Sequence, residues 1–206
     1  MTAIAAAFLA LTVAAPARSA EPPRHLIYLH GRIVQERQSA RPVNVRFGAY
    51  ELEKIRSAFR ERGFTVHSEI RPRTATVEES ADRVAAEVKR LLASGVPVER
   101  IAVVGASMGA SIAFLAAERL QLPGLRVATL GACLFENAKG PVGHLLAIRE
   151  ESDDLIGPCR AWNPAAAPPG LRARELVLHT GLSHGFLYRP LPEWVEPVAA
   201  FAASRD

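Results

Sequence analysis

Short apolar runs alternate along this chain with longer segments of helical periodicity, and this alternation restricts the possible fold most strongly. After residue 24, an apolar run of strand length is followed by a polar turn and then by apolar side chains at helical spacing, and the order repeats. Strands that alternate with helices of this length are typical of βαβ units and a parallel sheet. The sequence therefore predicts an α/β protein, a three-layer sandwich with a mostly parallel central sheet of about six strands.

The candidate elements can be placed along the chain. We expect strands at residues 25–29, 64–70, 100–104, 126–130, 145–149 and 175–179. We expect helices at residues 49–62, from Thr76 to shortly before Gly95, from the turn after the third strand to about Leu120, and at 194–203. Thr76 and Glu79 have the spacing of a capping box. The Pro- and Ala-rich stretch 159–172 is expected to be a loop or a broken helix.

The first twenty residues have the character of a signal peptide. Residues 4–15 form an apolar run that is too short to span a bilayer, and Ala15-Pro16-Ala17, or alternatively Ala17-Arg18-Ser19, fits a cleavage site of small residues. We therefore expect an exported protein, periplasmic or secreted, in which residues 21–206 form a single domain. A buried N-terminal helix or an uncleaved anchor is the alternative to a signal peptide. Because no later segment has 18 uncharged apolar residues, we expect no stable membrane insertion after processing.

The charge pattern and the turn sequences exclude several classes of partner. The 25 Lys and Arg residues exceed the 21 Asp and Glu residues by only four, and the basic residues are scattered among acidic ones, so we expect no nucleic-acid partner. No His, Cys or Asp cluster has the spacing of metal ligands, and no turn carries G-x-G-x-x-G. We expect neither a metal nor another cofactor, and the oligomeric state is not visible in the sequence.

Gly105-Ala106-Ser107-Met108-Gly109 forms a G-x-S-x-G motif between an apolar strand and an Ala-rich helix. This is the context that a nucleophile elbow requires, because the sharp turn lifts the serine hydroxyl out of the sheet beside the helix N-terminus. A serine hydroxyl is a poor nucleophile at neutral pH unless a base activates it. The motif thus predicts a nucleophilic Ser107 and requires a histidine nearby.

His184 is the best candidate for that base. Of the six histidines, four lie at the start of or within candidate strands, whereas His184 lies in a glycine-flanked loop after the last strand. The acid that would orient it follows the strand at 145–149, where Asp153 is favoured and Asp154 is an alternative one residue away. In open α/β sheets, ligands bind at the carboxyl ends of the strands, so these loops are expected to meet there.

With Ser107, Asp153 and His184 in this order, the sequence resembles the α/β-hydrolases. The resemblance extends from His30-Gly31 to His184 and is nearest to small, lid-less serine hydrolases of the dienelactone-hydrolase or carboxylesterase type. It implies an oxyanion hole formed by the backbone N–H groups of Met108 and Arg32. The chain departs from this pattern in three respects: it lacks the first antiparallel strands and a cap domain, and it has serine where dienelactone hydrolases have cysteine.

These features together predict a serine hydrolase that cleaves a small ester or thioester through an acyl-enzyme. An acyltransferase with the same triad and a non-catalytic binding protein that kept the fold are the alternatives. His30, Arg71 and Arg189 follow strand ends or His184 and are candidates for substrate binding, with solvated surface charge as the alternative for the arginines. Cys133 and Cys159 could form a disulfide in an exported protein, or remain two free thiols.

Overall fold

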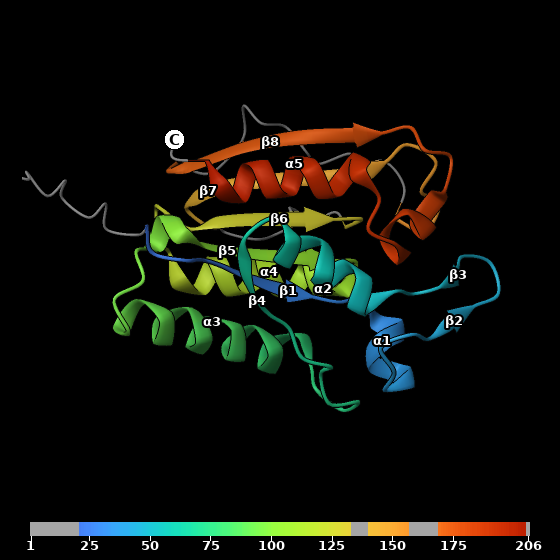
Figure 1. The fold of residues 1–206 in the computed structure, drawn as a ribbon, viewed down its shortest axis with the longest axis horizontal. Coiled ribbons are helices and arrows are strands. Elements are labelled where there is room, and N and C mark those ends of the chain that lie inside the picture. The colour runs from blue at the N-terminus through green and yellow to red at the C-terminus, as the bar shows by residue number, and fades with distance from the viewer. Residues whose placement is uncertain (1–20, 133–139, 157–168, 205–206) are drawn as a thin grey trace, which may run out of the picture.

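The computed structural model describes residues 21–132, 140–156 and 169–204. Its centre is a sheet of six strands in which every neighbouring pair is parallel (Figure 1). The spatial order is β4 (Phe64–His67), β1 (Arg24–Leu29), β5 (Ile101–Ala106), β6 (Arg126–Leu130), β7 (Gly143–Glu150) and β8 (Leu171–Leu178). The predicted α/β fold class, with about six strands, is therefore confirmed.

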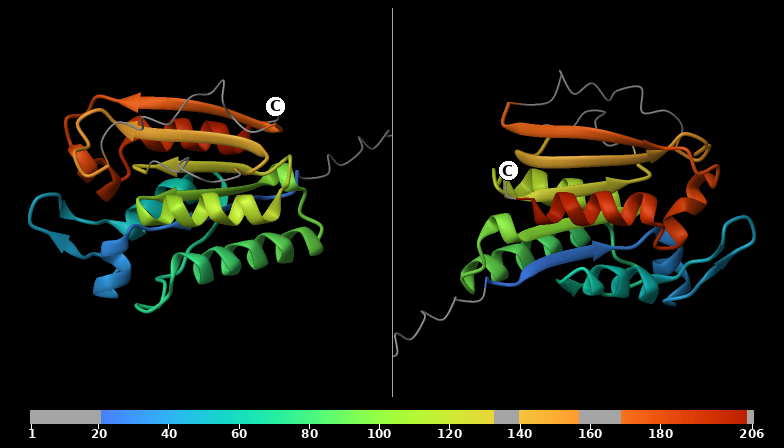
Figure 2. Two further views of the ribbon diagram at one scale, coloured as in Figure 1. Left: turned by 180° about the vertical axis from the view of Figure 1, so that it is seen from behind. Right: turned by 45° about the horizontal axis from the view of Figure 1, so that its top comes forward.

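Helices cover both faces of this sheet. On one face lie α2 (Leu52–Glu61) and α5 (Pro192–Ala203), and on the other lie α3 (Val77–Ala93) and α4 (Met108–Leu120) (Figure 2). The capping box predicted for α3 is present: the Thr76 hydroxyl accepts from the Glu79 N–H, and the Glu79 carboxylate accepts from the Thr76 N–H. This reciprocal pair satisfies two backbone donors at the start of the helix and fixes where it begins.

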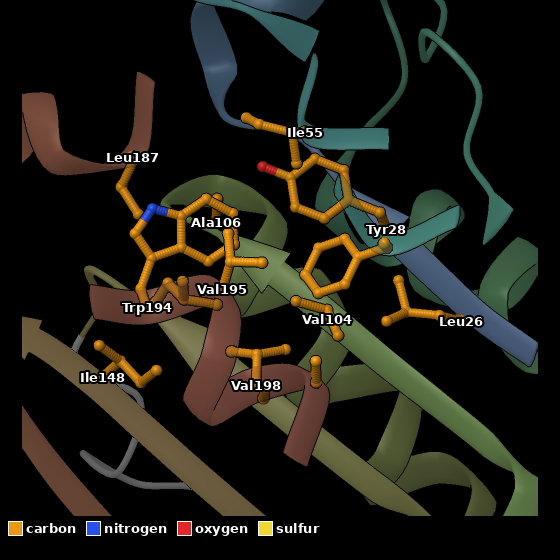
Figure 3. Packing of buried hydrophobic residues seen from close by; sticks show 14 of the residues in the cluster. Leu26, Tyr28, Ile55, Val104, Ala106, Ile148, Leu187, Trp194, Val195 and Val198 are labelled. Atoms are coloured by element: carbon orange, nitrogen blue, oxygen red, sulfur yellow. The ribbon is translucent and has the colours of Figure 1, made fainter. Parts of the chain in front are cut away.

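Apolar side chains from alternate positions of the strands form a core on each face. On the α2 and α5 face, Tyr28 and Val104 of the sheet pack against Ile55, Trp194 and Val198 of the two helices (Figure 3). These side chains are at most 1% exposed, so each removes nearly its whole apolar surface from water. This core packs the two helices against the sheet, and the loops at the carboxyl edge follow directly from its strands.

Several short elements were not predicted. They are α1 (Arg32–Arg37), an antiparallel hairpin of β2 (Val43–Asn44) and β3 (Gly48–Ala49), and the 3₁₀ helices η1 (Val98–Arg100) and η3 (Ser183–Tyr188). The long strand β8 begins at Leu171, inside the stretch expected to be a loop, and β4 stops at His67, earlier than expected. In Figure 1, α1 and the hairpin lie at the edge toward which the strand arrowheads point.

Some sequence-based expectations fall outside the described residues. These are the signal peptide at 1–20 and the cysteine pair Cys133 and Cys159. Within the described part of the chain, no helix is both long and apolar enough to cross a membrane.

Candidate active site

The site lies where the chain changes direction across the sheet. From β1 the chain moves outward to β4 and later returns to β5 on the other side of β1, so the carboxyl ends of β1 and β5 flank a topological switch point. Gly31 follows β1 and Ser107 follows β5. A cleft of about 430 Å³ opens here, lined by Gly31, Arg32, Ile33, Glu36, Arg37, Val43, Asn44, Val45, Tyr50, Ser107, Leu155, His184, Leu187 and Tyr188.

Ser107 occupies the strained turn that the motif predicts. Its φ of 53° and ψ of −122° are unusual for a residue with a side chain, and such a conformation persists only where its surroundings enforce it. The flanking glycines are required by close contacts: a Cβ at Gly105 would lie 2.1 Å from the Gly109 carbonyl oxygen, and one at Gly109 would lie 2.1 Å from the Leu29 carbonyl oxygen. The two glycines thus allow strand and helix to pack tightly enough to present the serine hydroxyl.

Three side chains from distant loops form one hydrogen-bonded chain. The Ser107 Oγ lies 3.0 Å from His184 Nε2, and His184 Nδ1 lies 2.7 Å from Asp153 Oδ2. Asp153 Oδ1 accepts the backbone N–H groups of Leu155 and Ile156 at 3.1 and 3.3 Å. His184 and Asp153 are 7% and 5% exposed, so this chain is largely shielded from water while Ser107 faces the cleft.

The neighbouring carboxylate of Asp154 points elsewhere. It accepts two hydrogen bonds from Arg46 Nη2, at 2.8 and 2.9 Å, and one from the Ser183 hydroxyl at 2.6 Å. The hydrogen bond from Ser183 and then the contact with Arg46 lower the pKa of Asp154. Of the two candidate acids, only Asp153 contacts the His184 ring.

Glu150 is a part of the site that the sequence interpretation missed. It stands beside another acidic residue, Glu151, as is typical of a solvated turn, but it is only 2% exposed. Its carboxylate accepts from the Ser152 hydroxyl and from the backbone and hydroxyl of Thr180, and also from the Gly181 N–H. Burial alone would raise the pKa of Glu150, but these hydrogen bonds hold it below its ordinary value. Glu150 therefore ties the loop that carries Asp153 to the loop that carries His184.

The backbone N–H groups of Met108 and Arg32, which are predicted to form an oxyanion hole, lie at the beginnings of two helices. Met108 is the first residue of α4 and Arg32 is the first residue of α1, so neither N–H has an acceptor within its own helix. The turn that carries Arg32 approaches the serine closely, since a Cβ built on Gly31 would lie 3.6 Å from the Ser107 Cβ.

The β2–β3 hairpin forms one wall of the cleft and contacts both loops. Arg46 at its turn pairs with Asp154, and Phe47 packs against Gly185 and against the His184 ring, whose centroid lies 6.3 Å away. Val43 and Val45, which line the cleft, are 66% and 105% exposed. This part of the cleft wall is therefore apolar and exposed to water.

The three residues considered for substrate binding do not line this cleft. His30 is fully buried; its Nδ1 donates to the Gly31 carbonyl at 2.9 Å, and its Nε2 accepts from the Arg71 N–H at 3.2 Å. Arg71 is also buried, and its guanidinium donates to the carbonyl of His30 and the side chain of Gln35. Arg189 is exposed outside the cleft. In this structure His30 and Arg71 support the turn beneath the cleft instead of facing a ligand in it.

The buried His30 makes stability depend on pH. Burial, and then the nearby Arg71 guanidinium, lower the pKa of His30 from 6.5 to about 3. Between these values the unfolded chain binds a proton that the folded protein excludes, so the stabilisation is complete above pH 6.5 and declines as the pH falls, by at most about 1.4 kcal/mol per pH unit.

We therefore expect His30→Asn to be less stable than the parent at pH 7.5, with the gap closing as the pH falls. Urea denaturation at pH 7.5, 6.5, 5.5 and 4.5 measures the free energy of unfolding of both proteins. A gap that stays constant or widens toward pH 4.5 would show that His30 is not held neutral by the fold.

The described residues include no group of three or more His, Cys, Asp or Glu side chains placed to hold a metal ion. The contacts around the cleft bring together a hydroxyl, an imidazole and a carboxylate, with backbone N–H groups at two helix starts. Such a set can transfer a proton to the imidazole, form a covalent bond to the hydroxyl oxygen and stabilise a developing negative charge.

A parallel sheet with a serine on a strained turn between strand and helix defines the α/β-hydrolase fold, and comparison with solved structures confirms this fold. A Klebsiella pneumoniae protein assigned as a dienelactone hydrolase has a TM-score of 0.57 and 15% identity, over 92% of this chain and 90% of that protein. An α/β serine hydrolase without a lid from Xanthomonas campestris has a TM-score of 0.51 and 15% identity, over 89% and 82%.

The thioesterase RedJ of the prodiginine biosynthetic pathway in Streptomyces coelicolor is similar in the same way. Its TM-score is 0.52 at 17% identity, over 93% of this chain and 90% of the thioesterase. No family model matches the sequence, and no curated protein matches it. At these identities the likenesses establish the fold, and the chemistry must be argued from the site itself.

Proposed function

We propose that this protein is a serine hydrolase that cleaves a small ester or thioester through Ser107, His184 and Asp153. The single observation that supports this most is the continuous hydrogen-bonded chain from the Ser107 Oγ through the His184 ring to the Asp153 carboxylate, at 3.0 and 2.7 Å. These distances are within the range in which a base can take a proton directly from a nucleophile. The serine hydroxyl also lines the cleft, where a substrate can reach it.

In the proposed reaction the Ser107 oxygen attacks the acyl carbon while His184 Nε2 takes the hydroxyl proton. Asp153 accepts a hydrogen bond from the His184 Nδ1–H and stabilises the imidazolium that forms. The N–H groups of Met108 and Arg32 donate to the negatively charged oxygen of the tetrahedral intermediate. Imidazolium then protonates the leaving alcohol or thiol, and a water molecule, activated by the same histidine, releases the carboxylic acid and restores Ser107.

The cleft supports a compact substrate with an apolar portion. Its volume of about 430 Å³ is at the lower end of ordinary ligand sites, and its mouth carries Val43, Val45 and Leu155. The only described hairpin at this edge is seven residues long, from Val43 to Ala49, so it walls the cleft on one side and leaves it open to water. Open access favours hydrolysis of small soluble acyl compounds. The names of the structural neighbours, which include a serine hydrolase and a thioesterase, agree with this class.

A fluorophosphonate probe tests the proposal on the whole protein. We expect one covalent adduct by intact mass, mapped to Ser107 by peptide sequencing, because only an activated hydroxyl attacks the phosphorus rapidly. The labelled protein should also lose the ability to hydrolyse a panel of short esters and thioesters. A protein that neither reacts with the probe nor hydrolyses any member of the panel would be the non-catalytic alternative, and the proposal would be wrong.

A further inference from the structure

A second cavity, of about 390 Å³, lies beside α3 and shares no lining residue with the cleft. It forms because β4 pairs with β1 only as far as Ile27 opposite His67, while β1 continues to Leu29. Beyond His67 the chain turns away, which leaves a gap between the end of β1 and the first turns of α3. The lining residues are Ile27, Tyr28, Leu29, His67, Ser68, Glu69, Arg71, Ser80, Arg83, Val84 and Glu87.

Buried polar atoms without a partner concentrate around this cavity. The described residues contain five such atoms, and three of them, Ser68 Oγ, Arg71 Nη1 and Ser80 Oγ, belong to residues that line it. A fourth, Arg56 Nε, belongs to a guanidinium that donates to the Ser68 carbonyl. Arg71 and Ser80 are only 2% and 3% exposed. Since buried polar groups in folded proteins are nearly always hydrogen-bonded, this concentration points to a missing partner.

The chemistry of these atoms determines whether their partner must donate or accept hydrogen bonds and what charge it carries. A guanidinium only donates hydrogen bonds, and a serine hydroxyl can donate one, so the partner must be an acceptor. The remaining nitrogens of Arg71 bind neutral oxygens, the His30 carbonyl at 2.7 Å and the Gln35 side chain at 2.9 Å. No carboxylate of the described chain forms an ion pair with Arg71, although its burial lowers its pKa to about 10. The charge of the exposed Glu69 acts on Arg71 without forming an ion pair with it, and a buried cation that has no ion-pair partner favours an anionic ligand.

The surrounding charges and apolar groups narrow the class of anion. Glu87 is engaged by Arg90 and His67, and the exposed Glu69 and Arg83, which also line the cavity, act on Arg71 with charges of opposite sign. One guanidinium therefore remains uncompensated, which matches a single negative charge better than a dianion. Ile27, Leu29 and Val84 give the cavity an apolar wall that a hydrocarbon group can cover.

We propose that this cavity binds a monoanionic carboxylate carried on a short apolar group, with the carboxylate at Arg71 and the hydroxyls of Ser68 and Ser80. The site is separate from the proposed catalytic residues and does not depend on their activity. Arg71 also donates a hydrogen bond to the His30 carbonyl. A ligand bound to Arg71 would therefore be linked, through this residue, to the turn that carries Gly31.

Ligand titration of the full chain, followed by calorimetry and by thermal unfolding, tests the proposal. We expect sodium butyrate to bind saturably and to raise Tm, whereas butyramide and sodium chloride at equal ionic strength do not. Ser80→Ala removes one donor to a charged acceptor and should weaken butyrate binding by about tenfold or more. Ser57→Ala, on α2 across the sheet, is the matched control and should bind like the parent.

Arg71→Lys provides a second variant. It keeps the positive charge, whereas a substitution that removes the charge could unfold the turn. It should weaken binding while the protein stays folded by circular dichroism. Absence of any butyrate-specific shift would mean that water alone fills the cavity, and tighter binding of inorganic phosphate would refute the monoanion assignment. Equal butyrate affinity in the parent, Ser80→Ala and Arg71→Lys would place the ligand elsewhere, for example in the catalytic cleft. Each of these three results overturns the proposal.

Discussion

Replacing Ser107 with alanine should reduce kcat/KM for a short activated ester by about 10⁴-fold or more, without unfolding the protein. The hydroxyl is the only group of the described cleft that is hydrogen-bonded to the His184 ring and so placed to form an acyl-enzyme. Without it, the N–H groups of Met108 and Arg32 can still polarise a bound carbonyl, so a small residual rate above that of water is expected. Steady-state kinetics with a 4-nitrophenyl ester, with an uncatalysed control, measure the loss.

Ser111→Ala is the matched control, since it makes the same chemical change one turn further along α4. We expect it to retain the activity of the parent, and we expect all three proteins to have similar circular dichroism spectra and Tm. If Ser107→Ala hydrolyses the ester at the parent's rate, the hydrolysis does not proceed through this residue. If both variants lose activity together with Tm, a loss of folded protein would be the cause, and refolding yields would have to be equalised before the comparison.

The elements that the sequence predicts well are those with strong local signals. The Thr76 capping box sets the start of α3 without reference to any distant residue, and the apolar side chains of α2, Leu52, Ile55 and Phe59, are buried as their spacing requires. The strand β6 matches its expected bounds because a short apolar run between polar turns leaves little freedom. Fold class followed from these local signals together with the strong preference for parallel strands in repeated βαβ units.

The elements that escaped prediction are formed by contacts between distant residues. The β2–β3 hairpin has two residues in each strand and places two valines in solvent, so neither periodicity nor burial marks it in the sequence. Its position is set by Arg46, which pairs with Asp154 across 108 residues, and by Phe47, which packs on Gly185. Nothing in the sequence of the hairpin indicated that it would contact the loops that carry Asp154 and Gly185.

The burial of two charged residues, Glu150 and Arg71, could not be predicted from the sequence either. Glu150 stands beside other acidic residues and looks like part of a solvated turn, yet it accepts hydrogen bonds from a loop thirty residues later. Arg71 follows a strand end, where ligands are often bound, but its side chain turns under the sheet edge to the His30 carbonyl. A charged residue at a strand end can face either the ligand or the support beneath it, and only the tertiary contacts distinguish the two cases.

The two adjacent aspartates allow the sharpest separation of roles. Asp153→Asn should lower kcat by about 10⁴-fold, because an amide N–H facing His184 Nδ1 favours the ring tautomer with its proton on Nε2, which cannot accept the Ser107 proton. Asp154→Asn alters an exposed pair with Arg46 and a hydrogen bond from Ser183, neither of which touches the ring, so a change of less than about fivefold is expected.

The test measures kcat of both variants and of the parent with the same ester, and uses Tm to show that each protein is folded. The substitutions have the same size and remove the same charge, so a nonspecific electrostatic effect would act on both similarly. Asp153→Asn should still react slowly with the fluorophosphonate probe, since its serine is present but lacks a competent base. Equal losses in the two variants, or a larger loss in Asp154→Asn, would mean that the acid is not the one whose Oδ2 lies 2.7 Å from the imidazole in this structure.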